Sequence, residues 1–383
     1  MIRLLVVDDS ALMRRLLKEI FEAEDGFEAA FARDGVEAMA MLHAFRPDVV
    51  TLDIHMPNMD GLACLDRIML ERPCPVVMFS TLTDAGAKET LDALALGAVD
   101  FALKPSGAVS LKVDDFGPAL VEKVRIAAAS KLARSRRLAE RVRLRTRRDL
   151  AAADGRATPS PRSPNDPPPK DLAATAPAPK VAAARGRTEP TGERLVLAGA
   201  STGGPPALDA LLSPLPADFP WPIVIAQHMP ASFTSALAAR LDRLCALKVA
   251  EIVRPVELQA GCVYVGRGDA DVIVSRRGEA LVALPAPSSA AHRWHPSVDR
   301  LVASAMEVAD PRRLVGVLMT GMGDDGAAAM TRLHGLGGAT IAEAEDTAVV
   351  WGMPGELARL GGAAFIEPLE RIAGRLLSLT ASA

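Results

Sequence analysis

Residues 4–20 read LLVVDDSALMRRLLKEI, and this stretch decides the fold of the first part of the chain. Its first four residues are an apolar run of the kind that forms a strand buried on both faces of a parallel sheet. Two aspartates end the run, Ser10 is a suitable helix N-cap, and apolar residues then recur at helical spacing. A buried strand that leads directly into an amphipathic helix predicts an α/β fold.

The same alternation of strand and helix patterns continues to about residue 128. Further apolar runs lie at residues 49–52, 76–79 and 99–103. Because repeated strand–helix units build parallel sheets with helices on both faces, residues 1–128 predict a doubly wound parallel-sheet domain.

Composition changes sharply after this domain. Residues 131–148 carry nine Lys or Arg and one Glu, a net charge of +8, so the rest of the chain carries −11 of the total of −3. Residues 151–193 hold nine of the 29 prolines and no aromatic residue. Such a segment cannot bury enough apolar surface to offset the entropy of ordering it. Residues 129–193 are therefore predicted to be a disordered linker, basic at first and then rich in Pro and Ala.

Buried-strand patterns resume at residue 195. They lie at residues 195–200, 223–226, 263–265, 272–274, 314–319 and 363–366. Residues 194–383 therefore predict a second doubly wound α/β domain, with a mostly parallel sheet and an antiparallel hairpin region near residues 263–284.

Composition also argues against several classes of protein. Aromatic residues make up only 4% of the chain, which disfavours a stacking surface for single-stranded nucleic acid. No apolar stretch approaches the roughly 20 residues of a membrane span, and the N-terminus lacks the pattern of a signal peptide. The four cysteines show no metal-binding spacing. We therefore expect a cytoplasmic protein with reduced thiols and no membrane insertion.

Polar side chains follow the predicted strands of the first domain. They are Asp8 and Asp9, then Asp53, Ser80 and Lys104. The carboxyl ends of parallel strands meet at one edge of a sheet, and three carboxylates there would repel each other unless a cation joined them. Oxygen ligands of this kind suit Mg²⁺, and the ion and the lysine together would neutralise a phosphoryl group. The sequence therefore predicts a phosphorylation site that uses Mg²⁺.

The motifs VVDDSALMRR, LDIHMPNMDGL, FSTLT and DFALKP resemble, in order and spacing, those of response-regulator receiver domains. The resemblance implies that Asp53 accepts the phosphoryl group. The metal ligands that it implies are Asp8, Asp9, Asp53 and the backbone carbonyl of His55, and the phosphate-sensing residues are Ser80, Lys104 and Phe101.

A second set of polar residues follows strands of the second domain. Residues 199–203, GASTG, fit the G-x-S-x-G pattern, in which a strand-to-helix turn lifts Ser201 to the rim of the sheet. The same Gly-rich turn could instead cradle a phosphate. His228 follows the strand in IVIAQHMP, and Asp324 and Asp325 follow the strand in VGVLMTGMGDDG. Nucleophile, base and acid thus fall at strand ends of one sheet, as a Ser-His-Asp triad requires.

Other histidines compete for the role of base. The chain order Ser, His, Asp differs from the order Ser, acid, His of α/β-hydrolases, and His334 would restore that order. A cation near a helix C-terminus explains His334 better. His292 and His295 lie beside a proline with no preceding strand, which favours a surface loop or a substrate contact.

The motifs GASTGGPPAL, AQHMPASFT, HPSVDRL, TGMGDDGAAAM and WGMPGEL together resemble the catalytic domain of the chemotaxis protein-glutamate methylesterases. The resemblance implies that Ser201 is the nucleophile, His228 the base and Asp325 the acid. Backbone amides near Met322 and His228 are candidates for the oxyanion hole, and the catalytic domain is expected to need no cofactor.

The function that this resemblance implies is hydrolysis of glutamate γ-methyl esters on methyl-accepting chemoreceptors, together with deamidation of receptor glutamines. The implied phosphodonor is a chemotaxis histidine kinase, and the unphosphorylated receiver domain is expected to block the catalytic cleft. Because closure entropy rises with linker length, a long linker predicts a moderate activation by phosphorylation. No nucleic-acid partner is expected.

Two alternative functions remain open at this point. One is a receiver-gated serine esterase whose substrate is not a chemoreceptor. The other is a receiver protein that binds nucleic acid through the basic segment 131–148. Four residues depart from the usual family pattern and bear on substrate preference. Trp294 and His295 replace His-Arg, Glu343 replaces Gln, and Trp351 replaces Phe.

Overall fold

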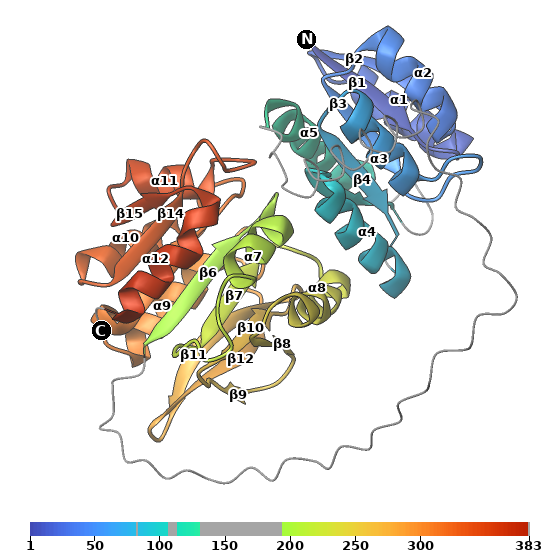
Figure 1. Ribbon diagram of the computed structural model, residues 1–383. Helices are drawn as coiled ribbons and strands as arrows, with labels where there is room; N and C mark the ends of the chain where they lie inside the picture. The colour runs from blue at the N-terminus through green and yellow to red at the C-terminus, as the bar shows by residue number, and fades with distance from the viewer. Residues whose placement is uncertain (82, 106–112, 131–193, 382–383) are drawn as a thin grey trace, which may run out of the picture.

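The computed structural model describes residues 1–81, 83–105, 113–130 and 194–381 (Figure 1). The predicted linker, residues 129–193, lies outside the described residues from residue 131 onward. Within the described residues, no helix is both long enough and apolar enough to cross a membrane.

The first domain is a five-stranded parallel sheet. Its strands are β1 (Ile2–Val7), β2 (Phe27–Ala32), β3 (Val49–Asp53), β4 (Val76–Ser80) and β5 (Asp100–Leu103), in the order β2-β1-β3-β4-β5. Helices α1 (Ala11–Glu22) and α5 (Val113–Ala129) cover one face, and α2 (Gly35–Phe45), α3 (Gly61–Glu71) and α4 (Asp84–Leu96) cover the other. The prediction of a doubly wound sheet is confirmed.

Local sequence explains how β1 passes into α1. The Ser10 hydroxyl accepts a hydrogen bond from the Met13 N–H at 3.3 Å, and the Ser10 N–H donates to Asp8 Oδ1 at 2.9 Å. The side chain therefore satisfies one of the N–H groups that a helix leaves free at its first turn. Strand β2 was not among the predicted strands, because this edge strand is only partly buried and lacks a long apolar run.

The second domain is built on a seven-stranded parallel sheet. Its strands are β6 (Leu195–Ala200), β7 (Ile223–Gln227), β8 (Lys248–Ile252), β10 (Cys262–Gly266), β13 (Leu314–Leu318), β14 (Ala339–Glu343) and β15 (Phe365–Glu367), in the order β15-β14-β13-β6-β7-β10-β8. Strands β9 (Val256–Glu257), β11 (Ala270–Arg277) and β12 (Ala280–Pro287) form a separate antiparallel sheet. This domain is also doubly wound, as predicted.

Helices cover both faces of the seven-stranded sheet. Helices α7 (Gly204–Leu212), α8 (Ala231–Leu244) and α12 (Leu369–Ala381) pack on one face. Helices α9 (Val298–Val308), α10 (Ala327–Gly335) and α11 (Met353–Arg359) pack with the antiparallel sheet on the other, and η2 (Pro311–Arg313) is a single 3₁₀ turn.

The predicted hairpin region needs a correction. Residues 263–265 do not belong to a hairpin, because β10 pairs in parallel with both β7 and β8. The antiparallel pair is β11 with β12, which joins residues 270–277 to residues 280–287. The pairing of β10 was ambiguous in the sequence, because a short apolar run fits a hairpin strand as well as a strand buried between two parallel neighbours.

The strand order reverses at one place in each sheet. In the first domain this place lies between β1 and β3, and in the second between β6 and β13. Ligands of open α/β sheets bind beyond the carboxyl ends of the strands at such a point. Asp8, Asp9 and Asp53 lie at the ends of β1 and β3, and Ser201 and Asp325 follow β6 and β13. The remaining candidates, Ser80, Lys104 and His228, lie at the ends of β4, β5 and β7.

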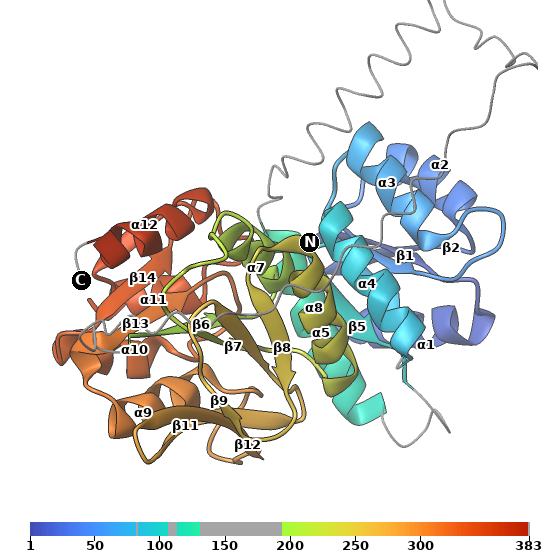
Figure 2. The same cartoon turned by 60° about the horizontal axis from the view of Figure 1, so that its bottom comes forward.

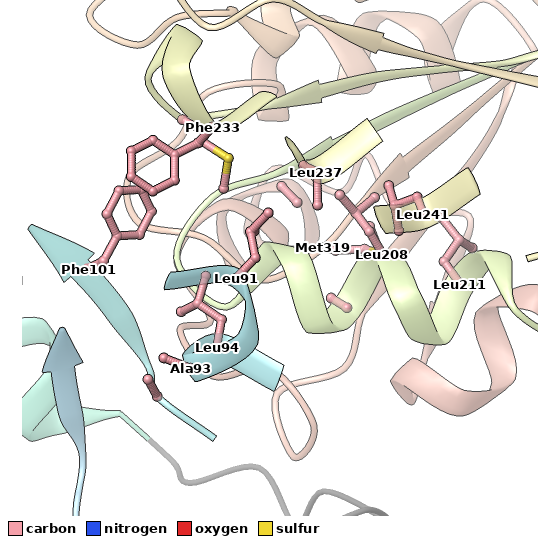
Figure 3. Close-up of a cluster of buried hydrophobic side chains, with 14 of the residues drawn as sticks. Leu91, Ala93, Leu94, Phe101, Leu208, Leu211, Phe233, Leu237, Leu241 and Met319 are labelled. Carbon is pink, nitrogen blue, oxygen red and sulfur yellow. The ribbon is translucent and has the colours of Figure 1, made fainter. Parts of the chain in front are cut away.

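The two domains pack against each other through helices. Helix α4 of the first domain contacts α7 and α8 of the second, as Figure 2 shows. A continuous apolar cluster crosses the boundary and includes Leu91 and Leu94 of α4 and Phe233 and Leu237 of α8 (Figure 3). The Phe101 ring stacks on the Phe233 ring with a centroid distance of 4.5 Å.

All four cysteines are free thiols, as expected for reduced cysteines. Cys64 and Cys74 are fully buried, and burial raises the pKa of each thiol to about 12. Thiols of this kind are inert, so they carry no part of the chemistry.

Candidate active site and phosphorylation site

Ser201 lies in the sharp turn between β6 and α7. Its N–H donates to the Thr320 carbonyl at 3.0 Å, and its own carbonyl accepts from the Gly204 N–H at 2.8 Å. Gly203 adopts φ +78°, and a Cβ there would lie 2.8 Å from Val349 Cβ. Only glycine fits this left-handed and crowded position, which lets the chain turn directly into the helix.

His228 lies next to Ser201 because of the register between β6 and β7. Ala200 pairs with Gln227, so the next residues of two neighbouring strands, about 4.8 Å apart, stand side by side. Gln227 Nε2 also donates to the carbonyls of Ser201 at 3.0 Å and His228 at 3.1 Å. The sequence analysis missed these two hydrogen bonds. A polar amide within an apolar strand is nevertheless a usable signal, because a buried amide needs hydrogen-bond partners.

Asp325 holds the imidazole of His228. Its Oδ2 lies 2.8 Å from His228 Nε2 and accepts from the Val298 N–H at 2.7 Å. Its Oδ1 accepts from the Ser297 hydroxyl and the Asp299 N–H, both at 3.0 Å. Burial alone would raise the pKa of Asp325, but these hydrogen bonds and the neighbouring imidazole hold it below its usual range. The carboxylate is therefore charged at neutral pH.

The other ring nitrogen, Nδ1 of His228, is buried and has no hydrogen-bond partner among the described residues. The imidazole side chain is only 6% exposed. Because Nε2 faces Asp325, Nδ1 is the ring nitrogen that no described protein group engages. Asp324 is exposed and does not take part in this hydrogen-bonding set.

One predicted oxyanion donor is wrong. The backbone N–H of His228 donates to the Ala200 carbonyl at 3.0 Å, because it belongs to the hydrogen-bond ladder between β6 and β7. Within the described residues, the N–H groups of Met322 and Thr202 donate to no protein acceptor. Thr202 directly follows Ser201, the position that supplies an oxyanion donor in G-x-S-x-G turns.

The Trp294 ring lies nearly parallel to the imidazole of His228. Its ring stacks on that of His228 with a centroid distance of 5.7 Å and an interplanar angle of 14°. The neighbouring His295 lies 2.8 Å from Asp271, a buried carboxylate that also accepts from Arg300 at 2.6 Å. His295 is thus tied to a structural ion-pair cluster that sequence reasoning missed.

His334 lies in the last turn of α10, as expected for a cation near a helix C-terminus. His292 lies in the loop between β12 and α9, where its N–H donates to the Ser289 carbonyl at 2.9 Å. His43, which received no role from the sequence, pairs with Glu71 at 3.3 Å on the surface of the first domain.

The acidic residues of the first domain also come together. Carboxylate oxygens of Asp8, Asp9 and Asp53 all lie within 4.8 Å of one another. Lys104 Nζ lies 2.9 Å from Asp8 Oδ2 and 2.7 Å from Asp53 Oδ2. Burial raises the pKa of Asp53, and the hydrogen bond and charge of Lys104 act in the opposite direction. The His55 side chain pairs with Glu89 at 3.1 Å, so it is engaged outside this cluster.

Ser80 and Phe101 take different positions around this cluster. The buried Ser80 hydroxyl accepts from the Thr90 hydroxyl at 2.7 Å, which directs it toward α4. Phe101 packs into the domain interface, where the residue is 7% exposed. Ser80 ends β4, which pairs with β3, the strand that ends at Asp53, and Phe101 lies on β5, the next strand of the sheet.

One hydrogen bond joins the first domain directly to the turn that carries Ser201. Asp100 Oδ2 accepts a hydrogen bond from the Thr202 hydroxyl at 2.7 Å, and the same oxygen pairs with Lys123 at 2.7 Å. Both Asp100 and Thr202 are buried. The contact therefore ties the strand that carries Phe101 to the residue after Ser201.

Two family profiles match the chain. The profile described as CheB methylesterase matches residues 196–376, and that described as response regulator receiver domain matches residues 4–113. Similar proteins match nearly the whole chain. "Protein-glutamate methylesterase/protein-glutamine glutaminase 2" of Rhodopseudomonas palustris strain BisB18 is 55% identical over 377 residues, which is 98% of each chain. "Protein-glutamate methylesterase/protein-glutamine glutaminase 3" of Rhodospirillum rubrum is 49% identical over 376 residues, 98% of this chain and 95% of the relative.

Proposed function

The chain belongs to the family of protein-glutamate methylesterases that carry a receiver domain, and we propose that Ser201, His228 and Asp325 perform its reaction. The reaction is hydrolysis of glutamate γ-methyl esters on chemoreceptors and deamidation of receptor glutamines. The observation that carries the assignment is the imidazole of His228, held by Asp325 beside Ser201 at the reversal of strand order. Family membership favours this function over an esterase for other substrates and over a nucleic-acid-binding regulator.

The hydrolysis proceeds in two steps. His228 Nδ1 takes the proton of Ser201 Oγ as this oxygen attacks the ester carbonyl, and the protonated imidazole then gives the proton to the departing methoxide. The products are methanol and a glutamyl ester of Ser201. Water attacks this ester with the same imidazole as base, which restores the serine and releases the glutamate. Asp325 stabilises the imidazolium and remains ionised.

The tetrahedral intermediate needs donors for its oxyanion. The free backbone N–H groups of Thr202 and Met322 are suited to this role. One such donor contributes roughly 3–4 kcal/mol to the transition state in a comparable site. A glutamine side chain presents the same carbonyl, with ammonia as the leaving group in place of methanol, so the same residues serve deamidation.

Mg²⁺ fits the acidic cluster of the receiver domain. The oxygens of Asp8, Asp9 and Asp53 form an all-oxygen donor set of the kind this ion prefers, and the His55 carbonyl would be a further protein ligand. The ion would neutralise charge on a phosphoryl group. Asp53 would accept that group from a histidine kinase, and Lys104 would pair with a phosphoryl oxygen.

The domain contacts support an inhibitory role for the receiver. Asp100 holds the Thr202 hydroxyl beside the nucleophile, and Phe101 stacks on Phe233 (Figure 3). Phosphorylation of Asp53 therefore activates the enzyme only if it favours an arrangement without these contacts, since a modification shifts an equilibrium by its differential effect on two states.

The function is tested by methanol release from methylated receptors. A small phosphodonor with Mg²⁺ is expected to raise the rate of the wild-type chain severalfold, and removal of Mg²⁺ by EDTA is expected to abolish the increase. Asp53→Asn is expected to show no increase, because it lacks the acceptor carboxylate. Equal wild-type rates with and without phosphodonor would contradict the inhibitory role of the receiver domain.

Loss of the aromatic stack is expected to activate the enzyme without phosphorylation. Phe101→Ala removes the ring that stacks on Phe233 at a centroid distance of 4.5 Å. Each 1.4 kcal/mol of stabilisation lost from the inhibited arrangement of the domains shifts the equilibrium toward the active arrangement about tenfold. We expect the rate without phosphodonor to rise about threefold to tenfold, because an aromatic pair contributes about 0.5–1.5 kcal/mol beyond its buried area. Leu12→Ala, at an exposed leucine of α1, is the control and should leave this rate unchanged. An unchanged rate in folded Phe101→Ala would argue against the stack as an inhibitory contact.

A further inference from the structure

Glu343 is a buried carboxyl group that the reaction above does not use. It is the last residue of β14, and its exposed fraction is 0%. It stands where the family usually has glutamine. A buried carboxyl is costly unless it is neutral, paired with a cation or fully hydrogen-bonded, so its surroundings decide what it does.

The hydrogen bonds of Glu343 lead to the nucleophile turn. Its Oε2 accepts from the Thr320 N–H at 2.8 Å. The Thr320 carbonyl in turn accepts from the Ser201 N–H at 3.0 Å, and the Thr320 hydroxyl donates to the Thr202 carbonyl at 2.9 Å. Glu343 is therefore two hydrogen bonds away from the nucleophile, through a residue that contacts the turn at both Ser201 and Thr202.

The charges around Glu343 do not compensate an ionised carboxylate. The elements packed around Glu343 carry both acidic and basic groups. The acids are Glu345 and Asp346 in the next loop, Glu367 on β15, Glu370 on α12, Glu356 on α11, and Asp324 and Asp325 after β13. The basic groups are Arg371 and Arg375 on α12, Arg359 on α11, and Arg332 and His334 on α10. Arg375 pairs with Glu367 at 2.6 Å, and Arg359 pairs with Glu356. Within the described part of the chain, no ion pair joins a cation to Glu343.

When Glu343 is a neutral acid, each polar group next to its side chain has a hydrogen-bond partner. In the ionised form the Thr347 hydroxyl donates to Glu343 Oε1 at 3.2 Å. In the neutral form the bond reverses, since the Glu343 O–H donates to Thr347 Oγ1 while the other carboxyl oxygen still accepts from the Thr320 N–H. The Thr347 hydroxyl then donates to the Ala344 carbonyl at 3.3 Å and accepts from the Leu369 N–H at 3.0 Å. A glutamine amide could form the same pattern, with its N–H₂ in place of the O–H. Burial raises the pKa of Glu343 to about 7, and Glu370 and Asp346 act in the same direction.

We propose that Glu343 is a positioning residue, which as a neutral acid holds Thr320 and thereby the Ser201–Thr202 turn, and which slows the reaction when it ionises. The proposal deepens the proposed function and rests on it. The ionised form places a negative charge beneath the turn at which the oxyanion develops, where no cation offsets it. A negative charge near a developing negative charge raises the barrier, and the effect is large in a buried site.

The test compares Glu343→Gln with the wild-type full-length chain, both activated by phosphodonor, at pH values from 5.5 to 8.5. The kcat for receptor demethylation should agree within about twofold at pH 5.5, and the variant should be about fivefold faster at pH 8.5, with KM unchanged. Comparison at equal pH cancels every ionisation that the two proteins share. Glu343→Leu leaves the Thr320 N–H unpaired and should be at least tenfold slower at every pH. Glu345→Gln, an exposed acid in the next loop, is the charge control and should show no pH-dependent ratio.

The rate at which a fluorophosphonate labels Ser201 gives a second measure of the same effect. The ratio of variant to wild type should rise with pH as the kcat ratio does. A ratio that stays constant from pH 5.5 to 8.5 in both assays would overturn the proposal. If the wild type releases no methanol from receptors but the labelling ratio rises with pH, the proposed substrate is wrong and the role of Glu343 stands.

Protein stability gives an independent expectation with a definite sign. The folded-state pKa of about 7 exceeds the ordinary value of 4.5, so between these values the unfolded chain is ionised while the folded chain is neutral. The contribution of Glu343 to the free energy of unfolding therefore becomes less favourable as pH rises through this window, and it is constant above the window. At pH 8, Glu343→Gln should raise the midpoint of thermal unfolding by about 5–10 °C, and by much less at pH 5.5. Equal midpoint shifts at the two pH values would contradict a neutral Glu343.

Discussion

Ser201→Ala is expected to abolish demethylation, with a loss of at least about 10⁴-fold in kcat. In the proposed reaction the serine oxygen forms the covalent bond to the glutamyl group, and alanine has no atom to replace it. The backbone should be unaffected, because the turn is held by the Ser201 N–H and carbonyl rather than by the hydroxyl. Methanol release under phosphodonor, together with the thermal midpoint, separates loss of chemistry from loss of fold.

The matched control is Ser213→Ala, at an exposed serine just after α7. This variant should hydrolyse the ester at the wild-type rate, since its hydroxyl lies at the far end of the helix that follows the nucleophile. Residual activity near the wild-type level in folded Ser201→Ala would show that another group attacks the ester, and the assignment of the nucleophile would fail.

Asp325→Asn is expected to lower kcat by about 10³–10⁴-fold, by analogy with the same change in a serine-protease triad. The asparagine side chain keeps the shape of the aspartate but loses the charge that stabilises the imidazolium. It also presents a donor where the carboxylate accepts from the Ser297 hydroxyl or the Asp299 N–H. In the opposite orientation the N–H₂ faces His228 Nε2, 2.8 Å away, and the imidazole loses the acceptor that fixes a proton on Nε2.

Asp324→Asn is the control for this change. The two aspartates are neighbours in the sequence, but Asp324 is exposed whereas Asp325 is buried against His228. Demethylation by Asp324→Asn should stay within about twofold of the wild type, as for a surface substitution. A large loss of activity in Asp324→Asn, with activity retained in Asp325→Asn, would assign the role of the acid to Asp324 instead of Asp325.

Residues at strand ends could be predicted because their positions depend on local patterns. Each apolar run ends at a polar residue, and parallel strands bring their carboxyl ends to one edge of the sheet. Asp8 and Asp53 are brought together in this way, as are Ser201 and His228. Strands β2 and β8 were missed because they are half-exposed and their apolar patterns are weak. Strand β14 was missed although four of its five residues are buried.

The free backbone amides could not be predicted in the same way. Whether an N–H is available for an oxyanion depends on strand register, which decided that the His228 amide bonds to Ala200 while the Thr202 amide stays free. The polarity of the His228 ring is also a tertiary property, because it depends on where α9 and the β13–α10 loop place Asp325.

The amino-acid sequence by itself determined two doubly wound parallel sheets and the residues at their strand ends, because hydrophobic periodicity and turn residues act within a few positions of the chain. Only the tertiary structure decided the partners of these residues. The bond from Thr202 to Asp100 joins groups 102 positions apart, and the bond from Thr320 to Glu343 joins groups 23 apart. Such contacts depend on how whole helices and strands pack, and packing energy is shared among many residues rather than encoded in any one motif.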